Sequence, residues 1–137
     1  MINSLFNSTT IPALEQVVSF TQSRHEVLAG NIANMDTPGY RSRDLSVETF
    51  QQRLSDAIQA TREQQEPFSP GIITHENNDP LHEVSKSIES ILFHDDSNVG
   101  LDQQVTEMLK NQSMHNMAIS IMNNQFRLLQ AAISERI

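Results

Sequence analysis

The stretch that decides the fold is residues 101–137, LDQQVTEMLKNQSMHNMAISIMNNQFRLLQAAISERI. It contains neither proline nor glycine, and Asp102 is a suitable N-cap. Residues suited to a helix interface recur along it with alternating spacings of four and three. They are Leu101, Val105, Met108, Gln112, His115, Ile119, Met122, Phe126, Leu129 and Ile133. A 3.5-residue repeat held over that length predicts one long helix with a left-handed coiled-coil seam.

A second apolar stripe lies roughly 100° or more around the same helix, because each residue advances by about 100°. Its members are Met114, Met117, Ile121, Leu128 and Ala131. In its C-terminal half this helix is therefore apolar over more than half of its circumference, and such a helix must be buried on several sides. A chain of 137 residues is too small to supply all of those partners. We therefore expect self-association or assembly into a polymer.

A second long helix is predicted from Ile11–Pro12 to about Asn34, with Thr9 or Thr10 as N-cap and proline in the first turn. One face of it carries residues at alternating spacings of four and three. They are Leu14, Val18, Thr21, His25, Leu28 and Ile32. Phe20 and Val27 lie on a second face. Together with Met117, Ile121 and Leu128, they are expected to contact other subunits.

The middle of the chain is more polar than its ends. Residues 46–60 predict a short amphipathic helix through Val47, Phe50, Leu54 and Ile58. Residues 61–98 contain scattered Pro, Gly, Asn and Asp, which predicts irregular structure. One more short helix is compatible with Val84, Ile88, Ile91 and Leu92. The expected organisation is a helical core formed by residues 1–40 and 99–137, with residues 41–98 inserted between them. The expected fold class is all-α.

Composition excludes several classes of function. The net charge of −8 and the lack of any Lys/Arg run argue against nucleic acid as a partner, since phosphate binding needs a basic surface. With no cysteine there is no disulfide framework and no Cys-based zinc site. The first residues, MINSLF, lack the basic and apolar regions of a cleaved signal peptide, and no apolar stretch reaches the length of a membrane span.

Residues 28–41, LAGNIANMDTPGYR, form the motif with the clearest local geometry. Asn34 is suited to a left-handed C-cap. Pro38 and Gly39 fit the two central positions of a type II turn, and Thr37 before the proline is biased towards extended geometry. Tyr40 should then pack the returning chain onto an apolar surface and find a partner for its hydroxyl. Gly30 and Asn31 suggest close helix approach and hydrogen bonds between subunits.

The run NIANMDTPGY, residues 31–40, resembles the N-terminal signature of flagellar rod, hook and hook-associated proteins. Its residues that match this signature are Asn31, Asn34, Thr37, Pro38, Gly39 and Tyr40. The extension through residues 41–45 and Phe50, and the segment from Asp96 to Ile133, resemble the proximal-rod branch of that family. These two ends cover about half of the chain.

The resemblance implies a fold and a set of partners. The terminal helices would pack as an antiparallel coiled coil lining a hollow tube, in the rod that joins the inner-membrane ring to the distal rod and transmits torque. Expected partners are other rod subunits and further copies of the chain, the ring and rod-adaptor proteins, and the type III export apparatus. Export would not involve a cleaved signal, and neither a cofactor nor a small-molecule substrate is implied. His115 stands where the family leads us to expect an aromatic residue.

The residues give little support to catalysis or metal binding. His75, His82 and His94 lie among acidic residues, but their spacing matches no zinc motif. His25 and His115 are expected to be packed or hydrogen-bonded at the helix interface. Asp44, Glu48, Glu63 and Glu66 are expected to be exposed. The alternative to a rod subunit is a soluble coiled-coil adaptor or export chaperone that uses the same seams transiently.

Overall fold

The computed structural model describes residues 10–65, 80–88, 92–95 and 100–134. In these ranges the chain is mostly helical, which confirms the predicted fold class. The elements are α2 (Ile11–Ala33), β1 (Ser42–Leu45), α3 (Val47–Gln65), α4 (Pro80–Lys86), β2 (Leu92–Asp95) and α5 (Leu101–Ser134). The two terminal helices and α3 lie where the sequence predicts them, and α3 extends further than expected.

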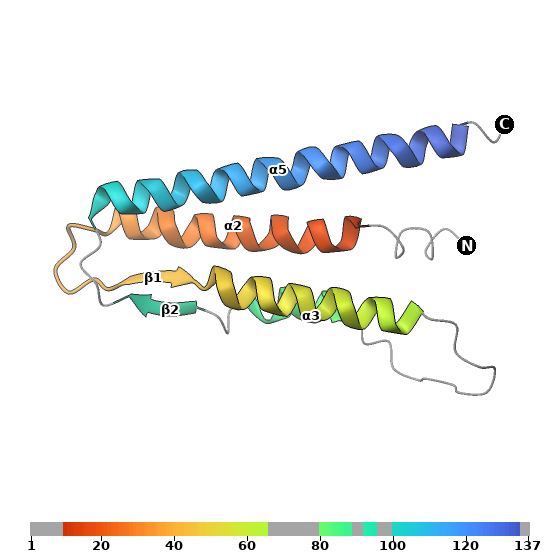
Figure 1. The fold of residues 1–137 in the computed structure, drawn as a ribbon. Helices are drawn as coiled ribbons and strands as arrows, with labels where there is room; N and C mark the ends of the chain where they lie inside the picture. The colour runs from red at the N-terminus through yellow and green to blue at the C-terminus, as the bar shows by residue number, and fades with distance from the viewer. Residues whose placement is uncertain (1–9, 66–79, 89–91, 96–99, 135–137) are drawn as a thin grey trace.

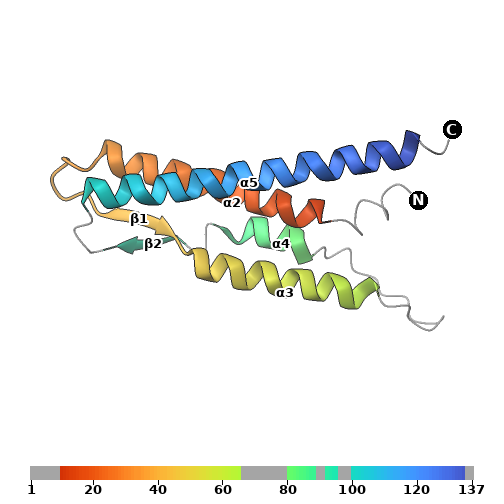
Figure 2. The ribbon, with the colours of Figure 1, turned by 45° about the horizontal axis from the view of Figure 1, so that its top comes forward.

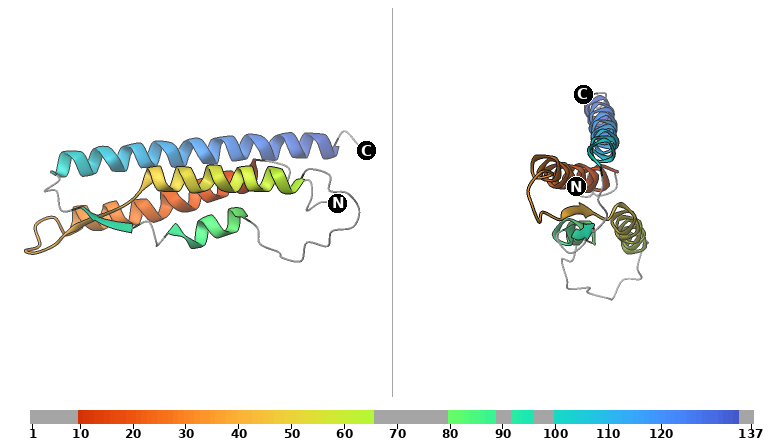
Figure 3. Two further views of the ribbon diagram at one scale, coloured as in Figure 1. Left: turned by 60° about the horizontal axis from the view of Figure 1, so that its bottom comes forward. Right: turned by 90° about the vertical axis from the view of Figure 1, so that its left-hand side faces the viewer.

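The molecule is elongated, and its long helices run nearly parallel to its length (Figure 1). Helices α2 and α5 lie side by side in antiparallel orientation, as the family resemblance implies. Seen from its end, the molecule has α5 on one side of α2, and α3 and α4 on the other (Figure 3). Figure 2 shows α3, α4 and the two strands together on one side of the α2–α5 pair. Helix α2 is therefore the central element, and it has two neighbours of different character.

Two short strands lie where the sequence predicted none. β1 pairs antiparallel with β2, from Ser42 opposite Asp95 to Leu45 opposite Leu92. The all-α prediction missed this sheet because four residues such as SRDL carry too little pattern, and their partner strand is distant in the sequence. Helix α4 also differs from the prediction. It begins at Pro80 and ends at Lys86, while Leu92 lies in β2 and Ile91 falls outside the described residues.

The apolar core lies between α2 and the α3–α4 layer. It is formed by the buried residues Phe20, Leu45, Phe50, Ala57, Leu81, Val84 and Ile88. The rings of Phe20 and Phe50 stack with centroids 4.0 Å apart and an interplanar angle of 9°. Phe20 is fully buried here, and Val27 packs against the same cluster. This corrects the expectation that Phe20 contacts other subunits, because α3 and α4 cover that face of α2 within the chain itself, whereas Val27 is half-buried.

Local sequence explains where α3 begins. The Ser46 side-chain oxygen accepts a hydrogen bond from the backbone N–H of Thr49 at 3.2 Å, which is the geometry of an N-cap. Val47, Phe50, Leu54 and Ile58 then face the core cluster, with Phe50 buried. The amphipathic pattern read from the sequence therefore gives both the helix and the face that it buries.

Truncation of the stacked ring tests this core. Phe20→Ala removes a fully buried aromatic side chain, and we expect it to lower the free energy of unfolding by about 3–5 kcal/mol. Urea unfolding followed by far-UV circular dichroism measures the loss. Met117→Ala is the matched control, because Met117 is 62% exposed, and its effect should stay within about 0.5 kcal/mol. Equal losses in both variants would contradict the placement of the core.

Candidate functional site: the α2–α5 seam and the turn after α2

The face that α5 packs against α2 is marked by its buried and half-buried residues. Most of them follow alternating spacings of four and three. We call this set of residues the polar row: Gln104, Met108, Asn111, His115, Ala118, Met122, Gln125 and Leu129. Of these, Gln104, Asn111 and Ala118 are buried. A seam built on two carboxamides and an alanine is unusual, because coiled-coil interfaces normally bury larger apolar residues.

The seam predicted from the sequence differs from the polar row at every second position. Met108, His115, Met122 and Leu129 belong to both. The other six predicted members are exposed: Leu101, Val105, Gln112, Ile119, Phe126 and Ile133. We call these six, together with the four shared residues, the apolar row. The exposed fractions of Val105, Ile119 and Phe126 are 40%, 38% and 43%. Periodicity located the helix and its repeat, but it could not distinguish two rows that lie one residue apart.

Of the predicted α2 seam positions, His25 is exposed, which corrects the expectation that it is packed at the helix interface. Thr21 does contact α5, through His115. Leu28 is buried, and Leu14, Val18 and Ile32 are half-buried. On α5, the predicted second-face residues Met117, Ile121 and Leu128 are exposed.

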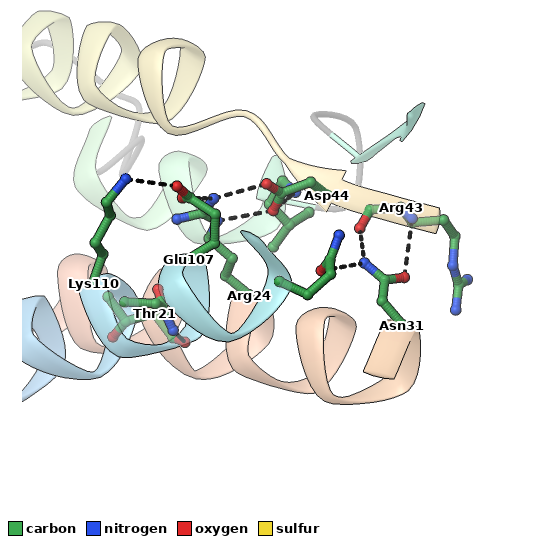
Figure 4. Close-up of polar contacts among 10 residues, drawn as sticks. Thr21, Arg24, Asn31, Arg43, Asp44, Glu107 and Lys110 are labelled. Atoms are coloured by element: carbon green, nitrogen blue, oxygen red, sulfur yellow. Dashed lines mark hydrogen bonds and ion pairs between the residues drawn. The ribbon is translucent and has the colours of Figure 1, made fainter. Parts of the chain in front are cut away.

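The side chain of Asn31 uses all of its hydrogen-bonding capacity within the chain, and Figure 4 shows its two hydrogen bonds with the Arg43 backbone. Its amide nitrogen donates to the backbone oxygen of Arg43 at 2.6 Å and to Oε1 of Gln104 at 3.3 Å. Its oxygen accepts from the Arg43 backbone N–H and from the Tyr40 hydroxyl, both at 3.0 Å. The carboxamide thus pairs with the outer edge of β1 as a neighbouring strand would. Asn31 is only 2% exposed, so the expected hydrogen bonds to other subunits are replaced by bonds inside the chain.

The turn after α2 has the geometry that the sequence predicts, except at its first residue. Gly39 has φ of 77° and the Tyr40 backbone N–H donates to the Thr37 oxygen at 3.1 Å, which defines a type II turn at Pro38–Gly39. Asn34 ends α2 with φ of −109° and not in the left-handed region, because its side chain bonds back to the Gly30 oxygen at 2.8 Å. Residues 35–39 are exposed.

A Cβ placed on Gly30 would meet nothing within 4 Å. Close approach inside the chain therefore does not explain this glycine.

An ionic cluster centred on the buried Arg24 joins α2, β1 and α5 beside the Asn31 site (Figure 4). Arg24, only 6% exposed, binds Asp44 through two hydrogen bonds of 2.8 and 2.7 Å and reaches Glu107 at 3.0 Å. The Asp44 contact above all, and then Glu107, raise the pKa of Arg24 against the opposing effect of burial. The expectation that Asp44 is a solvated carboxylate is corrected, because a guanidinium buried on α2 needs its charge neutralised there.

Glu107, the acidic residue that α5 contributes to this cluster, also forms an ion pair with Lys110. Lys110 bonds Glu107 at 2.8 Å, and this contact is the main reason why the pKa of Glu107 lies below its ordinary value of 4.5, with Arg24 adding to it against desolvation. The cluster therefore holds one face of α5 against α2 through opposite charges.

His115 takes part in the seam as the sequence predicts. Its Nδ1 lies 2.8 Å from the Thr21 hydroxyl oxygen, which is also within 2.9 Å of the Val17 and Val18 backbone oxygens. If the hydroxyl proton goes to one of those carbonyls, His115 carries its proton on Nδ1 and donates to Thr21. Asn111 donates from Nδ2 to the Thr21 backbone oxygen at 2.7 Å, and its Oδ1 is buried with no partner among the described residues.

Within the described ranges, no three His, Cys, Asp or Glu side chains gather as metal ligands. His25 and His82 are exposed, whereas His75 and the side chain of His94 lie outside the described part of the chain. In the same part, no helix combines the length and apolar character that a membrane crossing requires.

Comparison with known proteins shows that this part of the chain is similar to flagellar rod proteins. Residues 19–41, from the middle of α2 through the type II turn, match the family described as Flagella basal body rod protein. That stretch includes Thr21, Arg24, Asn31 and Tyr40, four of the residues that hold the seam and the turn.

Similarity extends along nearly the whole chain to individual rod proteins. The chain is 26% identical over 131 residues to the flagellar basal body rod protein FlgB of Bacillus subtilis, covering 96% of this chain and 97% of that protein. It is 26% identical over 123 residues to FlgB of Salmonella typhimurium, covering 82% of this chain and 84% of that protein. A 31-residue stretch, 23% of this chain and 25% of the relative, is 55% identical to FlgB of Aquifex aeolicus.

These similarities support a flagellar basal-body rod protein of the FlgB type. They support a structural role in the rod and a location in the flagellar basal body, and the relatives are named as rod proteins and not as enzymes.

Removal of the Asn31 carboxamide tests the site. Asn31→Ala leaves the Tyr40 hydroxyl and both Arg43 backbone groups without that partner, and we expect the free energy of unfolding to fall by about 2–3 kcal/mol. Tyr40 is the only tyrosine and the chain has no tryptophan, so its fluorescence reports on this site alone. Iodide quenching should increase in the variant. The exposed Asn116→Ala should change neither property, and unaltered quenching in Asn31→Ala would contradict the assignment.

The ionic cluster predicts a pH dependence. Because the folded pKa of Glu107 is lowered, its contribution is fully present above the unfolded value and is lost as pH falls through the folded value. Glu107→Gln should therefore be less stable than the parent chain at pH 7, and the gap should close as the pH falls below 4.5. Urea midpoints between pH 7 and pH 3 measure this gap. Glu48→Gln, at an exposed site on α3, serves as the control, and a gap in Glu107→Gln that is independent of pH would refute the prediction.

Proposed function

We propose that this chain is a subunit of the proximal rod of a bacterial flagellum. In this proposal it polymerises with copies of itself and with other rod subunits, connects the inner-membrane ring to the distal rod, and transmits torque. The observation that carries the proposal is the uncovered apolar surface of α5. Its exposed large apolar residues are Leu101, Val105, Leu109, Met117, Ile119, Ile121, Phe126, Leu128 and Ile133.

That surface lies on both flanks of the stripe that α5 presents to α2. Ile119 and Phe126 are on one flank, and Ile121 and Leu128 are on the other, according to their positions at about 100° per residue. A contiguous apolar surface on a stable protein marks a contact with another molecule. Two such flanks on one helix suit an assembly in which α5 has a neighbouring subunit on each side. A helical tube places its inner helices in that situation.

Torque transmission requires that the subunit itself does not yield. The seam between α2 and α5 combines the Arg24 ionic cluster with the four hydrogen bonds of Asn31, and the side chains of Arg24 and Asn31 are both buried. Directional contacts of this kind resist rotation and sliding of one helix against the other better than apolar contacts alone, because apolar contacts are non-directional. The polar seam thus supports a load-transmitting role.

The remaining partners are proposed from the family resemblance. The relatives are named basal body rod proteins, and we extend that name to contacts with the inner-membrane ring, the rod adaptor and the type III export apparatus. Passage through the exporter without a cleaved signal and a final place in the periplasm belong to the same proposal. The alternative function, a soluble adaptor or export chaperone, would also use an exposed apolar helix, but only transiently.

The test uses the bacterium that encodes this chain. Deletion of its gene is expected to abolish rods in isolated basal bodies and to abolish swimming, and the unaltered gene should restore both. Ile121→Asp/Leu128→Asp should fold, as judged by Tyr40 fluorescence, yet reduce swimming at least about tenfold because it charges an apolar contact surface. Asn123→Asp/Asn124→Asp adds the same charge at exposed polar positions and should swim normally.

Two results would overturn the proposal. Rods that assemble in the deletion strain would remove the chain from the rod. A purified chain that forms a stable, fully helical dimer by sedimentation, with swimming unaffected in Ile121→Asp/Leu128→Asp, would favour the adaptor.

A further inference from the structure

Helix α5 carries two overlapping heptad rows, and only one of them packs on α2. The polar row and the apolar row share Met108, His115, Met122 and Leu129. Where they differ, the polar row offers Gln104, Asn111, Ala118 and Gln125, and the apolar row offers Val105, Gln112, Ile119 and Phe126. Apolar burial alone would favour the apolar row, because it would remove more hydrocarbon surface from water. The structure shows the opposite choice.

We propose that Gln104 and Asn111 determine the rotational position of α5. In this position the polar row faces α2, and the residues found only in the apolar row stay outside. Gln104 accepts a hydrogen bond from Asn31 at 3.3 Å, and Asn111 donates one to the Thr21 backbone oxygen at 2.7 Å. Both amides are buried, at 6% and 2% exposure. Buried amides at single heptad positions select register at a cost in stability, and these two have the geometry for that role.

The unpaired oxygen of Asn111 indicates that this residue selects which row packs on α2, and that it does not strengthen the contact between the two helices. Oδ1 is buried without a partner among the described residues, so this amide has lost its hydration on one side without replacement. A residue kept only to strengthen the seam would be apolar here. A residue that excludes the other row needs only to have a lower free energy when the polar row faces α2 than when the apolar row does.

Rotation into the other row would hide one of the two apolar flanks that the rod is proposed to use. One residue corresponds to about 100° around the helix, and only half of the row positions shift by one residue. The change from one row to the other therefore needs a rotation of α5 by roughly 50°. Val105, Ile119 and Phe126 would then pack on α2, and Ala118 would become exposed. The selection of the row stands on the contacts above, whereas its importance for assembly rests on the proposed function.

Cysteine labelling shows which row of α5 is protected by α2, because the chain contains no cysteine of its own that would also react. Ala118→Cys and Ile119→Cys are made one at a time, in the parent chain and in Gln104→Leu/Asn111→Leu. In the parent chain, Ile119→Cys should react with a maleimide at least about tenfold faster than Ala118→Cys, since those positions are 38% and 3% exposed. In the double variant this order should reverse. The urea midpoint of Gln104→Leu/Asn111→Leu should be equal to or above that of the parent.

Gln103→Leu/Asn116→Leu is the matched control, because it makes the same exchanges at exposed positions of α5. It should keep the parent labelling order. An unchanged order in Gln104→Leu/Asn111→Leu overturns the inference, and so does a lower midpoint, since that would show the amides to be stabilising and not selective. Asn111→Leu alone provides the same labelling readout should the double variant fail to express.

Swimming of the same strains separates this inference from the proposed function. Reversed labelling with lost swimming supports both. Reversed labelling with normal swimming supports the selection of the row but contradicts the use of the apolar row in the rod. Parent-like labelling contradicts the selection of the row and leaves the proposed function to its own test.

Discussion

The carboxamide of Asn31 is the contact on which the arrangement of this chain depends. It is buried on α2, and its four hydrogen bonds reach the turn through Tyr40, strand β1 through Arg43, and α5 through Gln104. A buried amide with every position satisfied strongly disfavours other arrangements, because any shift leaves a polar group unpaired. The type II turn, the edge of the sheet and the start of α5 are all positioned relative to this one side chain.

Around that contact, α2 separates two kinds of interface. Towards α3 and α4 it buries Phe20 in an apolar core stacked on Phe50. Towards α5 it presents Thr21, Arg24 and Asn31, so the second interface is held by hydrogen bonds and charges. An apolar core supplies stability without direction, whereas polar contacts supply direction with little net stability. The chain assigns these two requirements to opposite sides of one helix.

The exposed apolar residues of α5 follow from the same division. Since the polar row occupies the contact with α2, Ile119 and Phe126 remain outside, where a monomeric protein would not keep them. Similarity to FlgB proteins along most of the chain supports a structural role in the flagellar rod. Polymer contacts through α5 agree with that role as a proposal.

The sequence by itself determined the long helices, the amphipathic helix at α3 and the type II turn, because each depends on residues close together in the chain. Helical spacing, Pro38–Gly39 and the absence of Pro and Gly after residue 100 are all local signals. The same kind of reading identified Asn31 and Tyr40 as important. It assigned Asn31 to contacts between subunits, because the partners Arg43 and Gln104 could not be seen from the motif.

Only the tertiary structure decided which faces are used, because that depends on what lies opposite. Phe20 became a core residue once α3 covered it, Asp44 became an ionic partner once Arg24 was buried beside it, and β1 formed once residues 92–95 reached it. Two rows one residue apart on α5 have nearly the same periodicity. The choice between them lies in hydrogen bonds from α2, and no pattern within α5 alone contains that information.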